Sequence, residues 1–142
     1  MTASHDRPAR GLLDTNTLIL LPRLPDASAL PLEPLISTIT LAELSVGPLV
    51  ARTGSERAAR QAHLQQAEAD FEPLPFDAAA ARAFGQVAAS LRRAGRKPAA
   101  RSYDAMIAAV AVANDLPLST CNPDDFEAIE QLRVNAVPHP DT

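Results

Sequence analysis

The chain of 142 residues contains no tryptophan, a single cysteine and only 4% aromatic residues. Its interior must therefore be built from alanine, leucine, valine and isoleucine. With Cys121 alone, the chain can form neither an internal disulfide framework nor a cysteine-cluster zinc site. No apolar run approaches the roughly 18 residues of a membrane-spanning helix. Because Asp14 and Asn16 interrupt the first apolar run, no signal-peptide pattern follows the N-terminus, and we expect a cytoplasmic protein with no membrane partner.

The length and charge of the chain are those of one ordinary domain. A chain of 142 residues leaves little room for a second core. The formal net charge is −4, from 13 basic and 17 acidic residues, which argues mildly against simple coating of nucleic acid. Five of the basic residues nevertheless fall between positions 92 and 101, namely Arg92, Arg93, Arg96, Lys97 and Arg101. This run is either a solvated helix end or a surface that contacts phosphates.

Short apolar segments alternate with amphipathic or alanine-rich segments along the chain. We expect residues 1–10 to form a flexible polar tail and residues 11–142 a single domain. The apolar pattern predicts strands at 11–14, 35–39, 71–76, 116–120 and 134–137. It predicts helices at 15–21, 40–46, 55–70, 77–93 and 104–114, and a helical turn at 126–132. This alternation predicts an α/β fold in three layers, with a central parallel sheet flanked by helices on both faces.

Acidic and amide side chains follow the predicted strands. In an open parallel sheet, ligands bind beyond the carboxyl ends of the strands. If these segments are parallel neighbours, their carboxylates meet at one edge, where their mutual repulsion favours a bound cation. Oxygen ligands of this kind suit Mg²⁺ or Mn²⁺. The residues concerned are Asp14, Glu43, Asp104, Asn122, Asp124 and Asp125.

Each of these acids also has a purely structural interpretation. Glu43 follows Thr40 by three residues, which is the spacing of a capping box. Asp104 stands near the start of a predicted helix, where the helix dipole favours an acid. The acids after the fourth strand can cap the turn that follows. Asp14 is harder to account for in this way, because a carboxylate buried behind Gly-Leu-Leu is costly without a partner.

Four segments in this order resemble the PIN domain family and, within it, the VapC toxins of bacterial toxin–antitoxin pairs. They read LLDTN at 12–16, TLAEL at 40–44, DAMIAA at 104–109 and LSTCNPDDF at 118–126. The resemblance runs from about Gly11 to Val137. It implies a PIN-like three-layer fold, a homodimer, and an endoribonuclease that depends on Mg²⁺ or Mn²⁺ and cleaves RNA with metal-activated water. It also implies neutralisation by a cognate VapB-like antitoxin.

The resemblance also implies roles for individual residues. Asp14, Glu43 and Asp104 match the first three catalytic, metal-binding acids of the family. The fourth position falls on Asn122 or Asp125, and since Asn122 is neutral, Asp125 is the charged candidate. Supporting positions around the acids are Thr15, Asn16, Thr120, Asn122 and Asp124. Candidates to bind RNA phosphates are Arg92, Arg93, Arg96 and Arg101.

Two other functions stay open at this point. A phosphatase of the haloacid-dehalogenase type also places an acid after the first strand, but it needs a second acid two residues later, where this chain has Asn16. A non-catalytic interaction domain that keeps the fold would account for the net acidity, but it leaves the buried Asp14 without a partner. Metal-dependent cleavage of RNA separates this alternative from the nuclease hypothesis.

Overall fold

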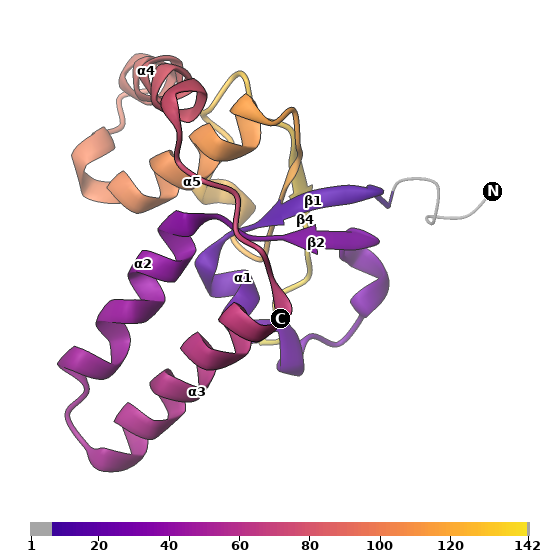
Figure 1. Ribbon diagram of the computed structural model, residues 1–142. Helices are drawn as coiled ribbons and strands as arrows, with labels where there is room; N and C mark the ends of the chain where they lie inside the picture. The colour runs from indigo at the N-terminus through magenta and orange to yellow at the C-terminus, as the bar shows by residue number, and fades with distance from the viewer. Residues whose placement is uncertain (1–6, 142) are drawn as a thin grey trace.

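The computed structural model describes residues 7–141, apart from the side chains of Pro98 and Ala100 (Figure 1). In this part of the chain, one sheet of four parallel strands has the order β2-β1-β3-β4. The strands are β1 (Arg10–Leu13), β2 (Glu33–Leu35), β3 (Leu118–Thr120) and β4 (Val134–Ala136). The chain leaves β1 toward β2, and it leaves β3 in the opposite direction, toward β4. The carboxyl ends of β1 and β3 therefore form the reversal point at which open parallel sheets bind ligands.

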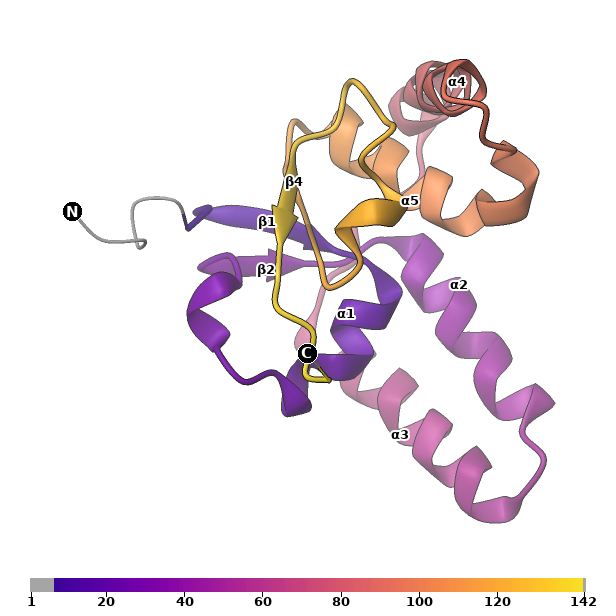
Figure 2. The same cartoon turned by 180° about the vertical axis from the view of Figure 1, so that it is seen from behind.

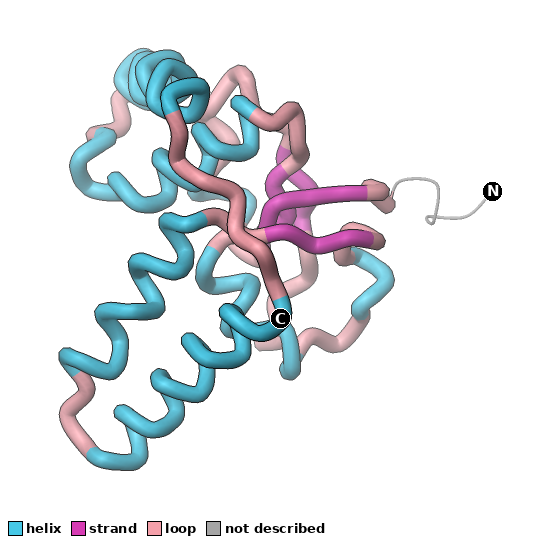
Figure 3. Tube along the Cα trace, viewed as in Figure 1, coloured by secondary structure: helices cyan, strands magenta, loops and turns pink. Residues whose placement is uncertain are grey.

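Helices cover the sheet from both sides (Figures 1 and 3). The α-helices are α1 (Thr15–Leu20), α2 (Thr38–Val46), α3 (Gly54–Asp70), α4 (Ala78–Arg93) and α5 (Ser102–Ala113). The short 3-10 helices are η2 (Leu21–Arg23), η3 (Ala27–Ala29), η4 (Gly47–Val50), η5 (Pro98–Arg101) and η6 (Pro123–Asp125). Both ribbon views show α2 and α3 side by side as a hairpin that extends away from the strands. Helices α4 and α5 pack against each other at the opposite end of these views (Figure 2). Among the described residues, no helix combines the length and apolarity needed to cross a membrane.

Two consecutive leucines of β1 show how the core is divided. Leu12 and Leu13 are both fully buried. Because successive side chains of a strand point to opposite faces, Leu12 packs into the cluster formed with α4 and α5. Leu13 packs on the other face, with Ile36, Leu44 of α2 and Ala67 of α3. Burial on both faces of the central strand confirms the predicted three-layer α/β fold.

The predicted strand at 35–39 is wrong in its extent. Pairing with β1 ends at Leu35, and Thr38 already begins α2. The side chain of Ser37 accepts a hydrogen bond from the Thr40 amide at 3.3 Å and so caps the helix. The β-branched residues 38–40 favour a strand by propensity, but the serine cap and the packing of α2 determine a helix here.

One further expected strand does not form, and the helical turn expected at 126–132 is present only as hydrogen-bonded turns. Residues 71–76 contain one isolated bridge, between Ser37 and Leu74, in place of a strand. Pro73 and Pro75 flank this bridge and lack the amide hydrogens that a ladder needs. Residues 126–132 form turns and contain no helix. The other predicted helices and strands are present, with their ends displaced by at most two residues.

The expected N-terminal tail is only partly described. Residues 1–6 lie outside the described residues. Residues 7–10, by contrast, are tied to the segment before β2. The Arg7 guanidinium donates to the Leu30 carbonyl at 2.7 Å, and the Leu32 amide donates to the Pro8 carbonyl at 2.9 Å. Since β1 itself begins at Arg10, the sheet starts earlier than the polarity of this segment suggests.

Replacing Ser37 with alanine tests the start of α2. Ser37 is fully buried, so the substitution leaves the Thr40 amide without its partner. We expect the free energy of unfolding to fall by about 1 kcal/mol, the usual effect of losing a serine cap, as measured by urea denaturation. Ser45→Ala in the same helix is the control, because Ser45 is exposed and donates only to the Leu41 carbonyl one turn back. Equal and small effects of the two substitutions would contradict the assignment of Ser37 as the cap.

Candidate active site

Asp14 directly follows β1 and is almost completely buried, with 4% of its surface exposed. One carboxylate oxygen accepts the Thr17 amide at 3.3 Å and caps α1. The other accepts the Thr120 hydroxyl, from the end of β3, at 3.0 Å. Burial raises the pKa of the Asp14 carboxyl above its usual value, and the hydrogen bonds from Thr17 and Thr120 oppose this shift. The carboxyl group is thus fixed between the ends of the two central strands.

Two buried threonines hold this junction together. The Thr120 hydroxyl, besides donating to Asp14, accepts the Asn122 amide at 2.9 Å. The Thr17 hydroxyl accepts the Cys121 amide at 2.9 Å, which joins α1 to the chain after β3. Thr120 was among the predicted supporting positions, whereas Thr17 was missed. Its only signal in the sequence is a threonine three residues after an acidic helix cap, within an otherwise apolar segment.

Glu43 reaches the same region from α2. The Thr15 hydroxyl donates to a Glu43 carboxylate oxygen at 2.6 Å and shares a second hydrogen bond with the Thr40 hydroxyl at 2.9 Å. Burial raises the pKa of Glu43, the Thr15 hydrogen bond lowers it, and the charge of Asp14 raises it further. The capping-box interpretation of Glu43 is wrong, because α2 begins at Thr38 and places Glu43 in its second turn.

Asp104 lies in the first turn of α5, and its pKa responds to the charges of the three other acids. Burial raises its pKa to about 6, and the charges of Asp14, Asp125 and Glu43 contribute to the shift in the same direction. Arg101 acts in the opposite direction. The four acidic side chains that sequence motifs singled out are therefore close enough to interact electrostatically, although they come from four separate segments of the chain.

Arg101 lies between two of these acids. Its guanidinium is 2.9 Å from an Asp125 carboxylate oxygen and 3.7 Å from an Asp104 carboxylate oxygen. About half of the Arg101 side chain is exposed. The guanidinium therefore provides positive charge within the acidic site and still faces solvent. The role of Arg101 as a phosphate contact stays a prediction, and the structure places its guanidinium beside the carboxylates.

The other three predicted basic residues have different surroundings. Arg93 forms an ion pair with Glu130 at 2.7 Å. Arg92 is exposed in the last turn of α4. Arg96 is exposed and lines, together with Arg101, a surface hollow of 490 Å³. Of these three, Arg96 is the one that extends the positive surface outward from Arg101.

Three predicted supporting residues do not contact the carboxylates through their side chains in any described hydrogen bond. Asp124 is exposed, and it interacts with Glu127, whose pKa it raises by hydrogen bonding and by like charge. Asn16 is exposed at a hollow of 230 Å³ that it lines with Thr15 and Glu43 among other residues. Asn122 contributes its backbone amide to Thr120, but its side chain does not cap η6.

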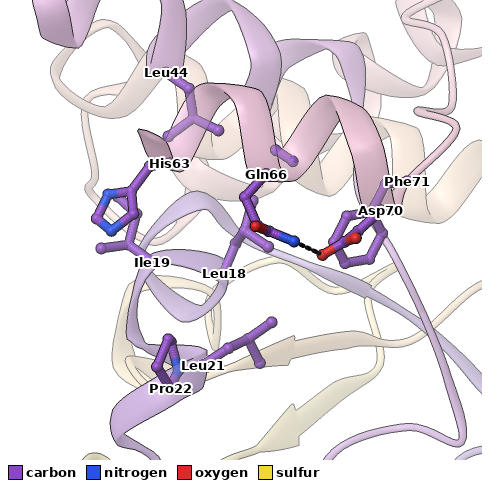
Figure 4. Close-up of a pocket in the computed structure, with 10 residues that line it drawn as sticks. Leu18, Ile19, Leu21, Pro22, Leu44, His63, Gln66, Asp70 and Phe71 are labelled. Carbon is purple, nitrogen blue, oxygen red and sulfur yellow. Dashed lines mark hydrogen bonds between the residues drawn. The ribbon is translucent and has the colours of Figure 1, made fainter. Parts of the chain in front are cut away.

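Two hollows of different character lie near the site. An open hollow of 690 Å³ is lined by Glu43, Ala99, Arg101, Ser102, Tyr103 and Asp104. A second, apolar pocket of 390 Å³ lies between α1, η2 and α3 (Figure 4). Leu18 and Ile19 of α1 face it, and its polar members include Gln66, which donates to Asp70 at 2.6 Å. Since the open hollow contains two of the acids and the apolar pocket contains none of the four, the open hollow is the candidate place for chemistry.

The residues at this edge fit a hard divalent cation in their chemistry. They are carboxylates and hydroxyls, the oxygen donors that Mg²⁺ and Mn²⁺ take in proteins. A cation would also relieve the repulsion from the neighbouring carboxylates that, after burial, contributes to the raised pKa of Asp104. As they stand, no three histidine, cysteine, aspartate or glutamate side chains of the described residues are near enough together to hold a metal ion. Because Arg101 bridges Asp104 and Asp125, a cation shared by those two carboxylates would have to take its place.

Comparison with known proteins gives a consistent result. Residues 12–132 match the PIN domain family. The chain is 41% identical over 125 residues to ribonuclease VapC5 of Mycobacterium tuberculosis, which covers 87% of this chain and 90% of that protein. The crystal structure of VapBC-5 from Mycobacterium tuberculosis, a member of the VapBC toxin–antitoxin family, superposes with a TM-score of 0.80. It has 39% identity and covers 92% of this chain and all of the matched chain.

A more distant structure extends the comparison. DNA-bound VapBC from Salmonella typhimurium superposes with a TM-score of 0.68 at 29% identity, over 90% of this chain and 98% of the matched chain. The family match and the curated relative each cover well over two thirds of the sequence. The chain therefore belongs to the PIN domain family.

Proposed function

We propose that this chain is the ribonuclease toxin of a VapBC-type toxin–antitoxin pair, and that it cleaves RNA with the help of Mg²⁺ or Mn²⁺. The observation that carries the proposal is the convergence of acidic charge on Asp104 at the reversal point of the sheet. The similarity to ribonuclease VapC5 supplies the substrate class. The haloacid-dehalogenase alternative is set aside, because the fold and the family are those of PIN domains.

Asp14 and Asp104 are the residues we assign to hold the cation, with Glu43 and Asp125 completing the set. Asp14 is suited to this because its carboxyl is fixed by Thr120 and by the Thr17 amide before any ligand arrives. When bound, a divalent cation supplies positive charge at the scissile phosphate and makes a water molecule more acidic. Because the four carboxylates repel one another and a phosphodiester alike, cation binding also permits the RNA to approach.

Glu43 and Arg101 have roles that follow from their own contacts. Glu43 is oriented by Thr15 and lines the open hollow, so its carboxylate is placed to orient an attacking water or to accept its proton. Its raised pKa makes it a stronger base than an exposed glutamate. Arg101, once released from Asp104 and Asp125, remains at the rim of the hollow to bind a phosphate.

A protein partner follows from the same comparisons. Two of the matched structures are VapBC toxin–antitoxin assemblies, and we therefore assign a cognate VapB-like antitoxin to this chain. The apolar pocket of 390 Å³ adjoins the acidic site. Ile19, Leu44 and His63 line this pocket and also line the hollow of 230 Å³ that contains Glu43.

The homodimer and the cytoplasmic location stay predictions.

Asparagine substitutions test the assignment of the cation ligands. We expect Asp14→Asn and Asp104→Asn each to lower the rate of RNA cleavage by more than about 100-fold, because even residues that only orient metal ligands contribute 10–100-fold. The assay is cleavage of a mixed structured RNA pool by antitoxin-free protein with Mg²⁺, Mn²⁺ or EDTA. Asp124→Asn makes the same change of charge at an exposed acid and should stay active. Cleavage that persists in EDTA or in both ligand variants would refute the assignment.

Thr15→Val tests whether Thr15 positions Glu43. Valine has nearly the same shape but cannot donate to the Glu43 carboxylate, so we expect cleavage to fall by about 10-fold or more. Thr15→Ser keeps the hydroxyl and should restore most of the rate. Circular dichroism and thermal melting confirm that each variant is folded. If valine and serine give the same rate as threonine, the hydrogen bond has no part in the reaction.

The raised pKa of Asp104 predicts a pH-dependent stability of the cation-free protein. An unfolded aspartate loses its proton near pH 3.8, whereas Asp104 in the folded chain keeps it to about pH 6. The folded state therefore binds more protons in this window, and its stability falls as pH rises through it. We expect Asp104→Asn in EDTA to raise the melting temperature at about pH 7.5 and to lose this advantage near pH 4.

The control for this measurement is Glu68→Gln, which removes one negative charge at an exposed position of α3. It should show little difference between the two pH values. An Asp104→Asn melting temperature that stays at or below the wild-type value at the higher pH would contradict the raised pKa of Asp104.

A further inference from the structure

Tyr103 is an exposed aromatic residue beside the catalytic acids. It stands in the first turn of α5, directly before Asp104, and 51% of its surface is exposed. The chain's four phenylalanines are buried or partly buried instead, namely Phe71, Phe76, Phe84 and Phe126. The sequence alone does not distinguish Tyr103 from these core residues. The fold leaves Tyr103 about half exposed and outside both buried apolar clusters.

The surroundings of Tyr103 connect it to the path of the substrate. It lines the open hollow of 690 Å³ together with Glu43, Asp104 and Arg101. Two of these are proposed catalytic acids, and Arg101 supplies positive charge for a phosphate. A nucleotide whose phosphate lies at the acids would therefore place its base near the rim of this hollow, within reach of the Tyr103 ring.

Resting on the proposed ribonuclease function, we propose that Tyr103 stacks against an unpaired base adjacent to the scissile phosphate. An aromatic face binds the π-face of any base, and this contact does not depend on base pairing partners. In a helix, the bases are already stacked and paired, so their faces are inaccessible to a protein ring. Stacking also provides binding free energy without added positive charge, which suits a chain with a net charge of −4.

The composition of the chain allows a direct spectroscopic test. Because Tyr103 is the single tyrosine and tryptophan is absent, tyrosine emission reports on this side chain alone. We would titrate the Glu43→Gln protein with a 12-nucleotide oligoadenylate in Mg²⁺, because this variant keeps Asp14 and Asp104 to hold the cation but lacks the carboxylate proposed to accept the proton of the attacking water. Anisotropy of a fluorescein-labelled copy follows binding independently. A parallel titration of N-acetyltyrosinamide corrects for absorption by the RNA.

We expect tyrosine emission to be quenched with the same midpoint as the rise in anisotropy. Binding that leaves the emission unchanged would overturn the proposal, as would a failure of the oligonucleotide to bind. Oligouridylate should quench less at saturation and bind more weakly than oligoadenylate, since the larger purine ring stacks better. Double-stranded RNA of the same length should give no quenching.

Kinetics of variants in the otherwise wild-type chain provide the second test. Tyr103→Ala should raise the KM for oligoadenylate cleavage by about 5- to 100-fold, the usual range for alanine substitution of stacking residues, and leave kcat within about twofold. Tyr103→Phe keeps the ring and should behave as the wild type. Leu49→Ala is the control for loss of an exposed apolar side chain, because Leu49 is 84% exposed on η4, outside the hollow.

The outcomes separate the two proposals. Equal KM values for the alanine variant and the wild type, a phenylalanine variant as weak as alanine, or a fall in kcat alone would each overturn stacking by Tyr103. In those cases the ribonuclease function stands, provided that cleavage still requires Asp14 and a divalent cation. Cleavage that survives Asp14→Asn and EDTA would instead remove the proposed function and, with it, the site to which the stacked base is assigned.

Discussion

The burial of one carboxyl group, that of Asp14, determines how this edge of the molecule is built. A carboxyl with 4% exposure requires hydrogen-bond donors, and here they come from Thr17 at the start of α1 and from Thr120 at the end of β3. The Thr17 hydroxyl in turn accepts the Cys121 amide. These contacts exist only if β1 and β3 are parallel neighbours. The burial of Asp14 and the parallel pairing of β1 with β3 therefore depend on each other.

The remaining acids give this edge an excess of negative charge, which Arg101 neutralises only in part. Burial raises the pKa of Asp104, the charges of Asp14, Asp125 and Glu43 raise it further, and the nearby positive charge of Arg101 lowers it. A guanidinium between two carboxylates can be exchanged for another cation at modest cost, because it is half exposed. In the proposed mechanism the same exchange frees Arg101 for a phosphate, so that one side chain links cation binding to RNA binding.

The sequence was sufficient to predict that the four acids lie near one another, because Asp14 directly follows a buried strand and a parallel sheet brings its strand ends together. Their roles in catalysis stay predictions. The sequence was insufficient to predict features that depend on contacts between distant parts of the chain. Residues 38–40 have strand propensity but form the first turn of α2, since Ser37 caps it. The contact of Arg101 with Asp125 joins segments far apart in the chain. The exposure of Tyr103 depends on how α5 packs, which no local pattern contains.

A domain that only bound a partner protein would gain nothing from this arrangement. Burial raises the pKa of Asp14, and burial together with like charges raises the pKa values of Glu43 and Asp104, which means that the folded state is stabilised when these groups are neutral. Apolar side chains of similar size at the same positions would avoid that cost, as they do in ordinary cores. The threonines Thr15 and Thr120 instead orient the carboxylates toward a common region. Burying these carboxylates weakens the fold, and specific hydrogen bonds nevertheless hold them in place. Such an arrangement is useful for chemistry at the site, and it therefore favours the nuclease over the interaction domain.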